Sequence, residues 1–116
     1  MEMKLIIAMV NDELTKTIIS AARDAGATGA TIVGSARGEG LKPEKTFFGL
    51  DLVAQRDMVL FLVAAPIARN ILEAIEEAGE MDENPGAGIA FQIAIEDAVG
   101  LKTQLPKLFE EVGEQI

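Results

Sequence analysis

Apolar residues fall into four short runs along the chain, each about as long as a β-strand. The runs cover residues 5–10, 28–36, 57–64 and 89–95. The first, third and fourth are almost continuously apolar, and the second is rich in small and β-branched residues. A strand with one wet face alternates apolar and polar residues, whereas a strand buried on both faces does not. The pattern predicts a sheet that is covered on both sides.

Two stretches between these runs repeat their apolar residues at the spacing of an α-helix. The first follows a candidate cap at Asn11 or Asp12, and Gly26 is expected to end it in a left-handed conformation. The second begins near Pro66, which suits the first turn of a helix, and is expected to end at Gly79. The predicted inner faces are Leu14, Ile18, Ala21, Ala22 and Ala25 in the first helix, and Ile67, Ile71, Leu72, Ile75 and Ala78 in the second.

The resulting order is β-α-β-β-α-β, an α+β arrangement of the ferredoxin-like, split βαβ kind. We expect a single domain over residues 1–116, with a core over 1–102 and a tail over 103–116 in which Pro106 opens a short helix. Both main helices should pack on one face of the sheet. The other face has no remaining helix to cover it except the tail, so we expect copies of the chain to bury it in a closed oligomer.

A long polar segment separates the second and third strands. It covers residues 37–56, reads RGEGLKPEKTFFGLDLVAQR and holds the adjacent aromatic residues Phe47 and Phe48. Links of this length in compact domains are usually functional or mobile. The two phenylalanines either anchor a partner protein or pack back on the host oligomer, and the sequence leaves both open.

Composition removes several classes of chemistry. Among 116 residues there is no cysteine and no histidine, which excludes disulfides, thiol nucleophiles, imidazole acid–base catalysis and the usual zinc sites. The net charge of −9 disfavours nucleic-acid binding. No apolar run approaches the ~20 residues that cross a bilayer, and the first residues lack the features of a signal peptide. We therefore expect a cytoplasmic binding protein without membrane insertion rather than an enzyme.

Several segments together resemble the PII family of signalling proteins. They are MKLIIAMV from residue 3, ATGATIVGSARGEG before the long segment, NILEAIEEAG in the second helix, and GAGIAF and IEDAVGL near the end. The resemblance extends over about residues 3–102. It implies a homotrimer with a nucleotide site in each cleft between subunits. It also implies that the long segment (the T-loop) grips a target protein, which is an enzyme, a transporter or a regulator.

The resemblance carries specific residues over to this chain. The phosphate-cradling turn of the family matches Gly86, Ala87, Gly88 and Ile89, and successive glycines can expose backbone N–H groups to an anion. A plain tight turn is the alternative interpretation. The remaining nucleotide contacts would be Met9, Thr31, Arg37, Gly38, Glu39, Gly40, Leu62 and Lys102.

Departures from the family pattern bear on the effector. The phosphate-binding lysine of the family falls on Ile89, and its two phosphate-binding arginines fall on Gly100 and Lys102. The loss of two positive charges weakens the hold on a triphosphate, so AMP or ADP is favoured over ATP as effector, and Arg37 is a candidate to compensate in part. Arg56 replaces the lysine that helps to hold 2-oxoglutarate. The chain has no tyrosine, so the uridylylation known in the family cannot occur.

Other functions carried by related folds fit the residues less well. Acylphosphatase chemistry needs an arginine in a loop after the first strand and an asparagine on a strand, and Asn84 lies in a predicted turn instead. CutA-like trimers share the fold, but the histidine and cysteine ligands of a metal sensor are missing, and the acidic residues of the second helix do not converge. We therefore expect no catalytic and no metal site. A structural or interaction trimer, or a sensor of a non-nucleotide ligand, remains the alternative.

Overall fold

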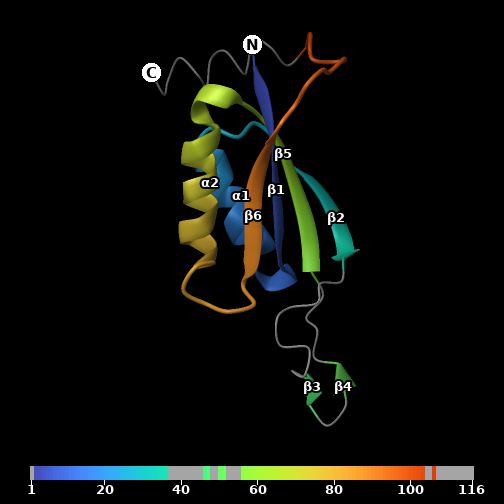
Figure 1. The fold of residues 1–116 in the computed structure, drawn as a ribbon, viewed down its shortest axis with the longest axis vertical. Helices are drawn as coiled ribbons and strands as arrows, with labels where there is room; N and C mark the ends of the chain where they lie inside the picture. The colour runs from blue at the N-terminus through green and yellow to red at the C-terminus, as the bar shows by residue number, and fades with distance from the viewer. Residues whose placement is uncertain (1, 37–45, 48–49, 52–55, 104–105, 107–116) are drawn as a thin grey trace.

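The computed structural model describes residues 2–36, 46–47, 50–51, 56–103 and 106. Its main strands are β1 (Met3–Asn11), β2 (Thr31–Ala36), β5 (Arg56–Ala64) and β6 (Gly88–Ala94), and its α-helices are α1 (Thr15–Asp24) and α2 (Ala65–Gly79). A short 3-10 helix, η1 (Asp12–Leu14), precedes α1, and a small hairpin joins β3 (Thr46–Phe47) to β4 (Leu50–Asp51). Figure 1 shows this order along the chain.

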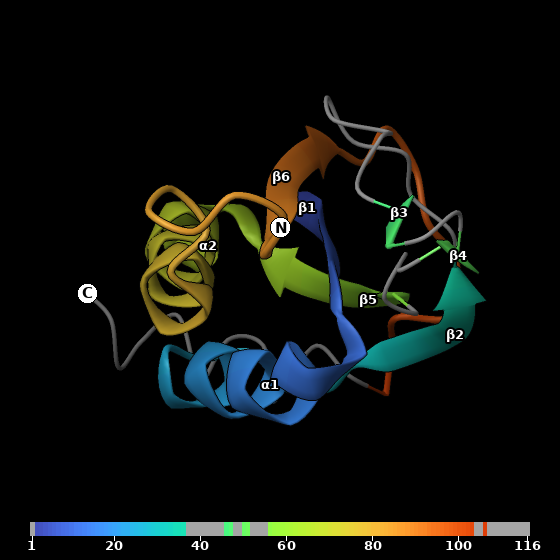
Figure 2. The same cartoon turned by 90° about the horizontal axis from the view of Figure 1, so that it is seen from below.

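The strands form one antiparallel sheet in the order β2-β5-β1-β6. β1 lies between β5 and β6 and is antiparallel to both, while β2 pairs with β5 at one edge. β1 and β2 are therefore parallel with β5 between them, as a split βαβ unit requires. Both helices lie on one face of the sheet (Figure 2). The predicted α+β, ferredoxin-like fold is confirmed.

The predicted strands match the observed ones apart from their ends. β2 starts at Thr31 rather than at residue 28, and its pairing with β5 is interrupted between Val33 and Ala36. The interruption contains Gly34, and the residue with positive φ is its neighbour Ser35 at 61°. Arg56 opens β5 rather than ending the long segment. The hairpin β3–β4 inside that segment was not predicted, because two-residue strands leave no periodic signal.

The helix ends show two different uses of glycine. Gly26 follows α1 with a φ of 118°, in the positive region that was expected of it. α2 ends at Gly79 as predicted, but the left-handed residue is its neighbour Glu80, with a φ of 50°. A Cβ on Gly79 would lie 3.1 Å from Ile18 Cδ1. Gly79 is therefore small because α1 and α2 approach each other there.

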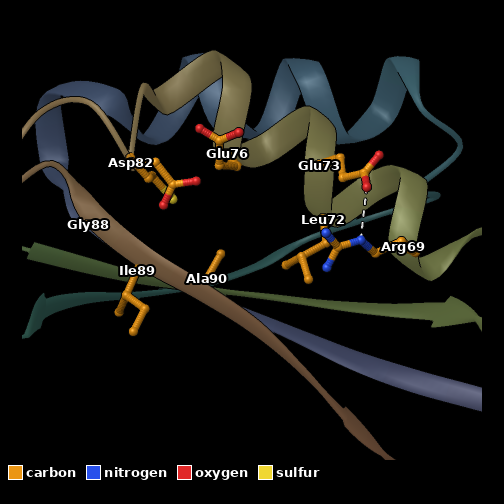
Figure 3. A pocket seen from close by; sticks show the side chains of 9 residues that line it. Arg69, Leu72, Glu73, Glu76, Asp82, Gly88, Ile89 and Ala90 are labelled. Atoms are coloured by element: carbon orange, nitrogen blue, oxygen red, sulfur yellow. Dashed lines mark hydrogen bonds and ion pairs between the residues drawn. The ribbon is translucent and has the colours of Figure 1, made fainter.

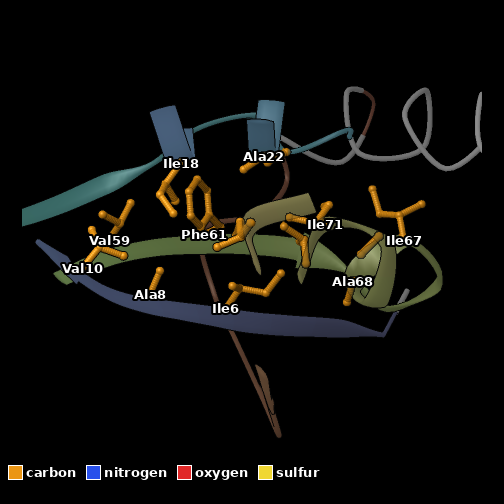
Figure 4. Close-up of a cluster of buried hydrophobic side chains, with 14 residues drawn as sticks. Ile6, Ala8, Val10, Ile18, Ala22, Val59, Phe61, Ile67, Ala68 and Ile71 are labelled. Atoms are coloured by element: carbon orange, nitrogen blue, oxygen red, sulfur yellow. The ribbon is translucent and has the colours of Figure 1, made fainter. Parts of the chain in front are cut away.

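A single apolar core lies between the helices and the sheet (Figure 4). Phe61 is fully buried at its centre, together with Ile6, Ile18 and Ile71. Leu72 and Ala78, which were assigned to the inner face of α2, are only half-buried at its border. Among the helices of the described residues, none is long and apolar enough to cross a membrane.

The opposite face of the sheet is apolar and open. Leu5, Ile7 and Met9 alternate on β1 with the buried core residues, and each pairs on both sides with an apolar residue of β5 or β6. The partners are Leu62 and Ile93 for Leu5, Leu60 and Phe91 for Ile7, and Met58 and Ile89 for Met9. On β6 the exposed fractions reach 39% for Phe91, 45% for Ile93 and 59% for Ile89. This apolar surface, here called the open face, is covered by no helix within the described ranges.

Candidate functional site

The turn between α2 and β6, residues 80–87, is held by its own backbone. The Asn84 N–H donates to the Glu80 carbonyl at 2.9 Å, and the Ala87 N–H donates to the Asn84 carbonyl at 3.1 Å. The Asn11 N–H at the end of β1 donates to the Ala87 carbonyl at 3.3 Å. The turn is therefore fixed to the sheet, and the N–H of Ala87 is already engaged within it.

Two glycines, Gly86 in this turn and Gly88 directly after it, are required for different reasons. Gly88 opens β6 with a φ of 151°, and a Cβ there would lie 2.5 Å from the Met9 carbonyl oxygen and 3.1 Å from Val10 Cα. Only glycine allows the backbones of β6 and β1 to approach so closely. Gly86 has a φ of 83°, and apart from its chain neighbours no atom of the described residues lies within 4 Å of its Cβ position. Glycine is therefore required at position 86 for its backbone conformation and not because of close packing.

Arg56 links this turn to the start of β5. Its Nη2 donates to the Gly86 carbonyl at 3.0 Å, across 30 positions of sequence. β5, β1 and β6 all have an end on this side of the sheet, since Arg56 pairs with Asn11 and Gly88 pairs with Val10. In Figure 1 the turn and the start of β5 lie at the same, lower end of the sheet. A guanidinium thus contacts the turn predicted to bind an anion.

The neighbouring residue Asp57 fixes the same end of the sheet to the helical layer. The hydroxyl of the buried Thr15, the first residue of α1, donates to Asp57 Oδ2 at 2.6 Å. Arg56 and Asp57 therefore connect the start of β5 to the turn and to α1. The long segment ends where β5 begins, so the point at which it rejoins the sheet is fixed by two contacts.

A groove of about 240 Å³ runs between α2 and β6 beside the turn (Figure 3). Its floor is apolar, with Leu72, Met81 and Ala90, and its rim is charged. Arg69 donates to Glu73 at 2.9 Å on the rim. The lining residues are Arg69, Leu72, Glu73, Glu76, Met81, Asp82, Gly88, Ile89 and Ala90. Of the predicted site residues only Gly88 and Ile89 are among them.

The groove residues of α2 were not predicted as site residues. Arg69, Leu72, Glu73 and Glu76 recur at helical spacing, so one helix face could have been expected to line something. The sequence does not say that this face lies against the edge strand β6. Glu76, which lies outside the predicted inner face of α2, is half-buried at the groove. The described residues hold no group of three acidic side chains close enough for a metal ion.

The predicted nucleotide contacts divide into two groups within one chain. Met9 pairs with Ile89, next to Gly88 and the turn. Thr31 lies on β2, the opposite edge strand, and pairs with Leu60 two residues before Leu62. Three strand spacings, about 14 Å, separate β2 from β6. Lys102 follows β6, whose last residue Ala94 pairs with Lys4 at the end of the sheet opposite the turn. One chain does not bring the two groups together.

Some predicted residues lie outside the described residues. They are Arg37, Gly38, Glu39, Gly40 and Phe48, together with all but Pro106 of the predicted tail helix. Phe47 is placed by its backbone alone, in β3 opposite Leu50. The predicted roles of these residues in binding a ligand or a partner stay predictions.

The chain forms an α+β domain with a glycine turn between α2 and β6. A long segment connects the end of β2 to the start of β5. The family described as nitrogen regulatory protein P-II matches residues 3–105. A solved PII-like signalling protein from Thermus thermophilus is 26% identical, with a TM-score of 0.58 over 81% of this chain and 87% of that chain. A search of curated proteins found no match. The chain belongs to the nitrogen regulatory protein P-II family of signalling proteins.

Proposed function

We propose that this protein is a cytoplasmic homotrimeric sensor that binds a small effector in clefts between subunits. The effector is an adenine nucleotide, with AMP or ADP preferred over ATP. Through the segment 37–55 the trimer regulates a target protein, which is a transporter, an enzyme or a regulator. Phe47 and Phe48 are the proposed anchors for that target, and the protein acts by binding rather than by catalysis.

The observation that carries this proposal is the fixed glycine turn. Gly86 leaves open space beside a backbone that is fastened to β1 and contacted by a guanidinium. A pre-formed turn of this kind binds an anion without having to be ordered first. The resemblance of the sequence to the family assigns a phosphate to the same turn. The geometry of the turn and the resemblance to the family therefore both support an anionic ligand that carries phosphate.

The separation of the two residue groups supports a site between copies. Thr31 and Leu62 lie toward one edge of the sheet, and Met9 and Ile89 lie toward the other. In a closed ring of identical subunits, one edge of each copy meets the other edge of its neighbour. Such a ring also buries the open face. We propose that the cleft takes Thr31, Leu62 and Lys102 from one subunit and the turn from the next.

Charge supports a preference for fewer phosphates. Ile89 stands where the family carries a lysine, and the exposed acidic residues Glu80, Asp82 and Glu83 belong to the turn itself. Each further phosphate adds negative charge to surroundings that are already acidic. ATP should therefore bind more weakly than AMP.

Calorimetric titration with AMP, ADP and ATP, with and without Mg²⁺, tests the proposal. We expect AMP or ADP to bind most tightly to the natural chain. Ile89→Lys restores the cation of the family and should tighten ATP by about tenfold relative to AMP. Ser20→Lys, which adds the same charge on the exposed side of α1, is the matched control and should leave the order unchanged.

Two results would count against the proposal. Tighter binding of ATP than of AMP by the natural chain would contradict the charge preference. If none of the three nucleotides binds, an adenine nucleotide is excluded as the effector. The protein would then be a structural trimer or a sensor of another ligand.

A further inference from the structure

The contact between Arg56 and the turn places a positive charge beside the glycines. The acceptor is the backbone carbonyl of Gly86, which is neutral, so the hydrogen bond leaves the charge of the guanidinium in place. A guanidinium carries five N–H donors in a planar fork, and this contact comes from one of its nitrogens. The side chain is oriented toward the turn, and among the described residues its one side-chain hydrogen bond is to Gly86.

The space for that ligand is on the side of Gly86. Apart from Gly86 and its two chain neighbours, no atom of the described residues lies within 4 Å of the position where a Cβ would stand at Gly86, whereas Gly88 is closely packed against Met9 and Val10. A ligand group that reaches the turn therefore approaches Gly86. The guanidinium that is bonded to the carbonyl of Gly86 lies next to that approach.

The acidic charges around the turn favour a nearby cation if an anion is to bind there. Glu80, Asp82 and Glu83 are exposed in the turn, and an anion would meet their repulsion. Position 89, directly after the turn, holds an isoleucine. Among the described residues, Arg56 is the cation with a side-chain hydrogen bond to this turn.

We propose that Arg56 is a ligand-binding residue whose guanidinium contacts a single phosphoryl group seated at the turn 86–88. The planar fork of arginine matches two oxygens of a phosphoryl group. Arg56 thereby replaces the cation missing at position 89 from a different strand. This inference rests on the proposed function for the site and adds the residue that holds the phosphoryl group.

The test uses the full chain with AMP and inorganic phosphate as probes. Arg56→Gln keeps most of the side-chain volume and removes the charge, and Arg56→Lys retains the charge without the fork. Arg23→Gln is the matched control, because it removes the same charge from the exposed end of α1. Calorimetry gives the AMP affinity, and the amide resonances of Gly86 and Gly88 in ¹⁵N NMR spectra report occupancy of the turn by either probe.

We expect Arg56→Gln to weaken AMP binding by roughly 10- to 100-fold, Arg56→Lys by less, and Arg23→Gln by less than about twofold. Binding should also weaken less steeply with added NaCl in Arg56→Gln than in Arg23→Gln, because the charge that salt would screen has been removed. An arginine that merely held the turn in shape would not change this salt dependence. Thermal melting checks that the variants fold.

The outcomes separate this inference from the proposed function. Equal AMP affinity and equal salt dependence in Arg56→Gln and Arg23→Gln would overturn the role of Arg56 and leave the nucleotide site standing. Phosphate could shift the amide resonance of Gly86 in a way that depends on Arg56, while AMP does not bind. That result would exclude a nucleotide as effector and support the role of Arg56 in binding a phosphoryl group. If neither probe moves the resonances of the turn, both proposals are wrong.

Discussion

At the scale of single residues, the backbone contact at Gly88 makes the clearest demand on the sequence. Its Cβ position lies 2.5 Å from the Met9 carbonyl oxygen, which cannot move without disturbing the pairing of β1 with β6. Any side chain there would push the edge strand away. The glycine thus serves the fold before it serves a ligand, so loss of binding in a Gly88 variant would not by itself locate the ligand.

Gly88→Ala should therefore lower the free energy of unfolding by about 1–3 kcal/mol, as overpacking typically does. Gly29 is the matched control, since nothing lies within 4 Å of its Cβ position. Gly29→Ala should change stability by less than about 1 kcal/mol in either direction. Urea unfolding followed by circular dichroism measures both. Equal stability of the two variants would show that β6 can shift without cost.

The residue scale also marks a limit of prediction from sequence. The glycines at 86 and 88 are visible as a motif, and the missing lysine at 89 is visible as a departure. Arg56 was predicted to belong to the partner-binding loop. Its contact with Gly86 joins positions 30 apart, and no local pattern records such a pair. The contact depends on the start of β5 and the start of β6 lying at the same end of the sheet, which is a property of the tertiary structure.

At the scale of elements, α1 is joined to the sheet at the start of β5, where the long segment ends. The hydrogen bond between Thr15 and Asp57 fixes the first turn of α1 to the start of β5. Thr15 is 6% exposed, so its removal would leave the Asp57 carboxylate without this partner in a partly buried place.

Thr15→Val removes the hydroxyl and keeps the shape of the side chain. We expect it to lower the free energy of unfolding by about 1–3 kcal/mol, the cost of leaving a partly buried polar group unpaired. Thr17→Val makes the same change at an exposed position of α1 and should cost less than about 0.5 kcal/mol. Thermal and urea unfolding of both variants check this, and a neutral Thr15→Val would mean that water replaces the hydroxyl.

Element order and approximate element bounds followed from periodicity, because long apolar repeats survive in any context. The start of β2 did not, since residues 28–30 are small and carry no pattern that separates strand from loop. The groove between α2 and β6 was also missed. It depends on which helix lies beside the edge strand, and this is decided by tertiary packing.

At the scale of the whole molecule, the main feature is the open face of the sheet. The four strands were predicted to be covered on both sides, and the helices of the described residues cover only one side (Figure 2). Ile7, Phe91 and Leu60 form one of its rows across three strands. Contiguous apolar surface of this kind marks an interface in soluble proteins. The oligomer that we propose buries this surface and joins the two parts of the site.

Phe91→Glu places a charge in the middle of the open face, and the cost of burying it should dissociate the oligomer. Phe91 is 39% exposed in the single chain, so the fold itself should tolerate the change. Asn70→Glu adds the same charge on the exposed side of α2 and should leave the assembly intact. Size-exclusion chromatography separates the two variants, and circular dichroism confirms that each is folded.

Sedimentation equilibrium of the natural chain tests the proposed homotrimer most directly, because the proposed site exists only if copies assemble. We expect a mass of about 37 kDa, three times the 12.3 kDa of one chain. A mass of one chain at micromolar concentration would contradict it. The turn and the edge around Thr31 would then remain on opposite sides of an isolated sheet, and no cleft would unite them.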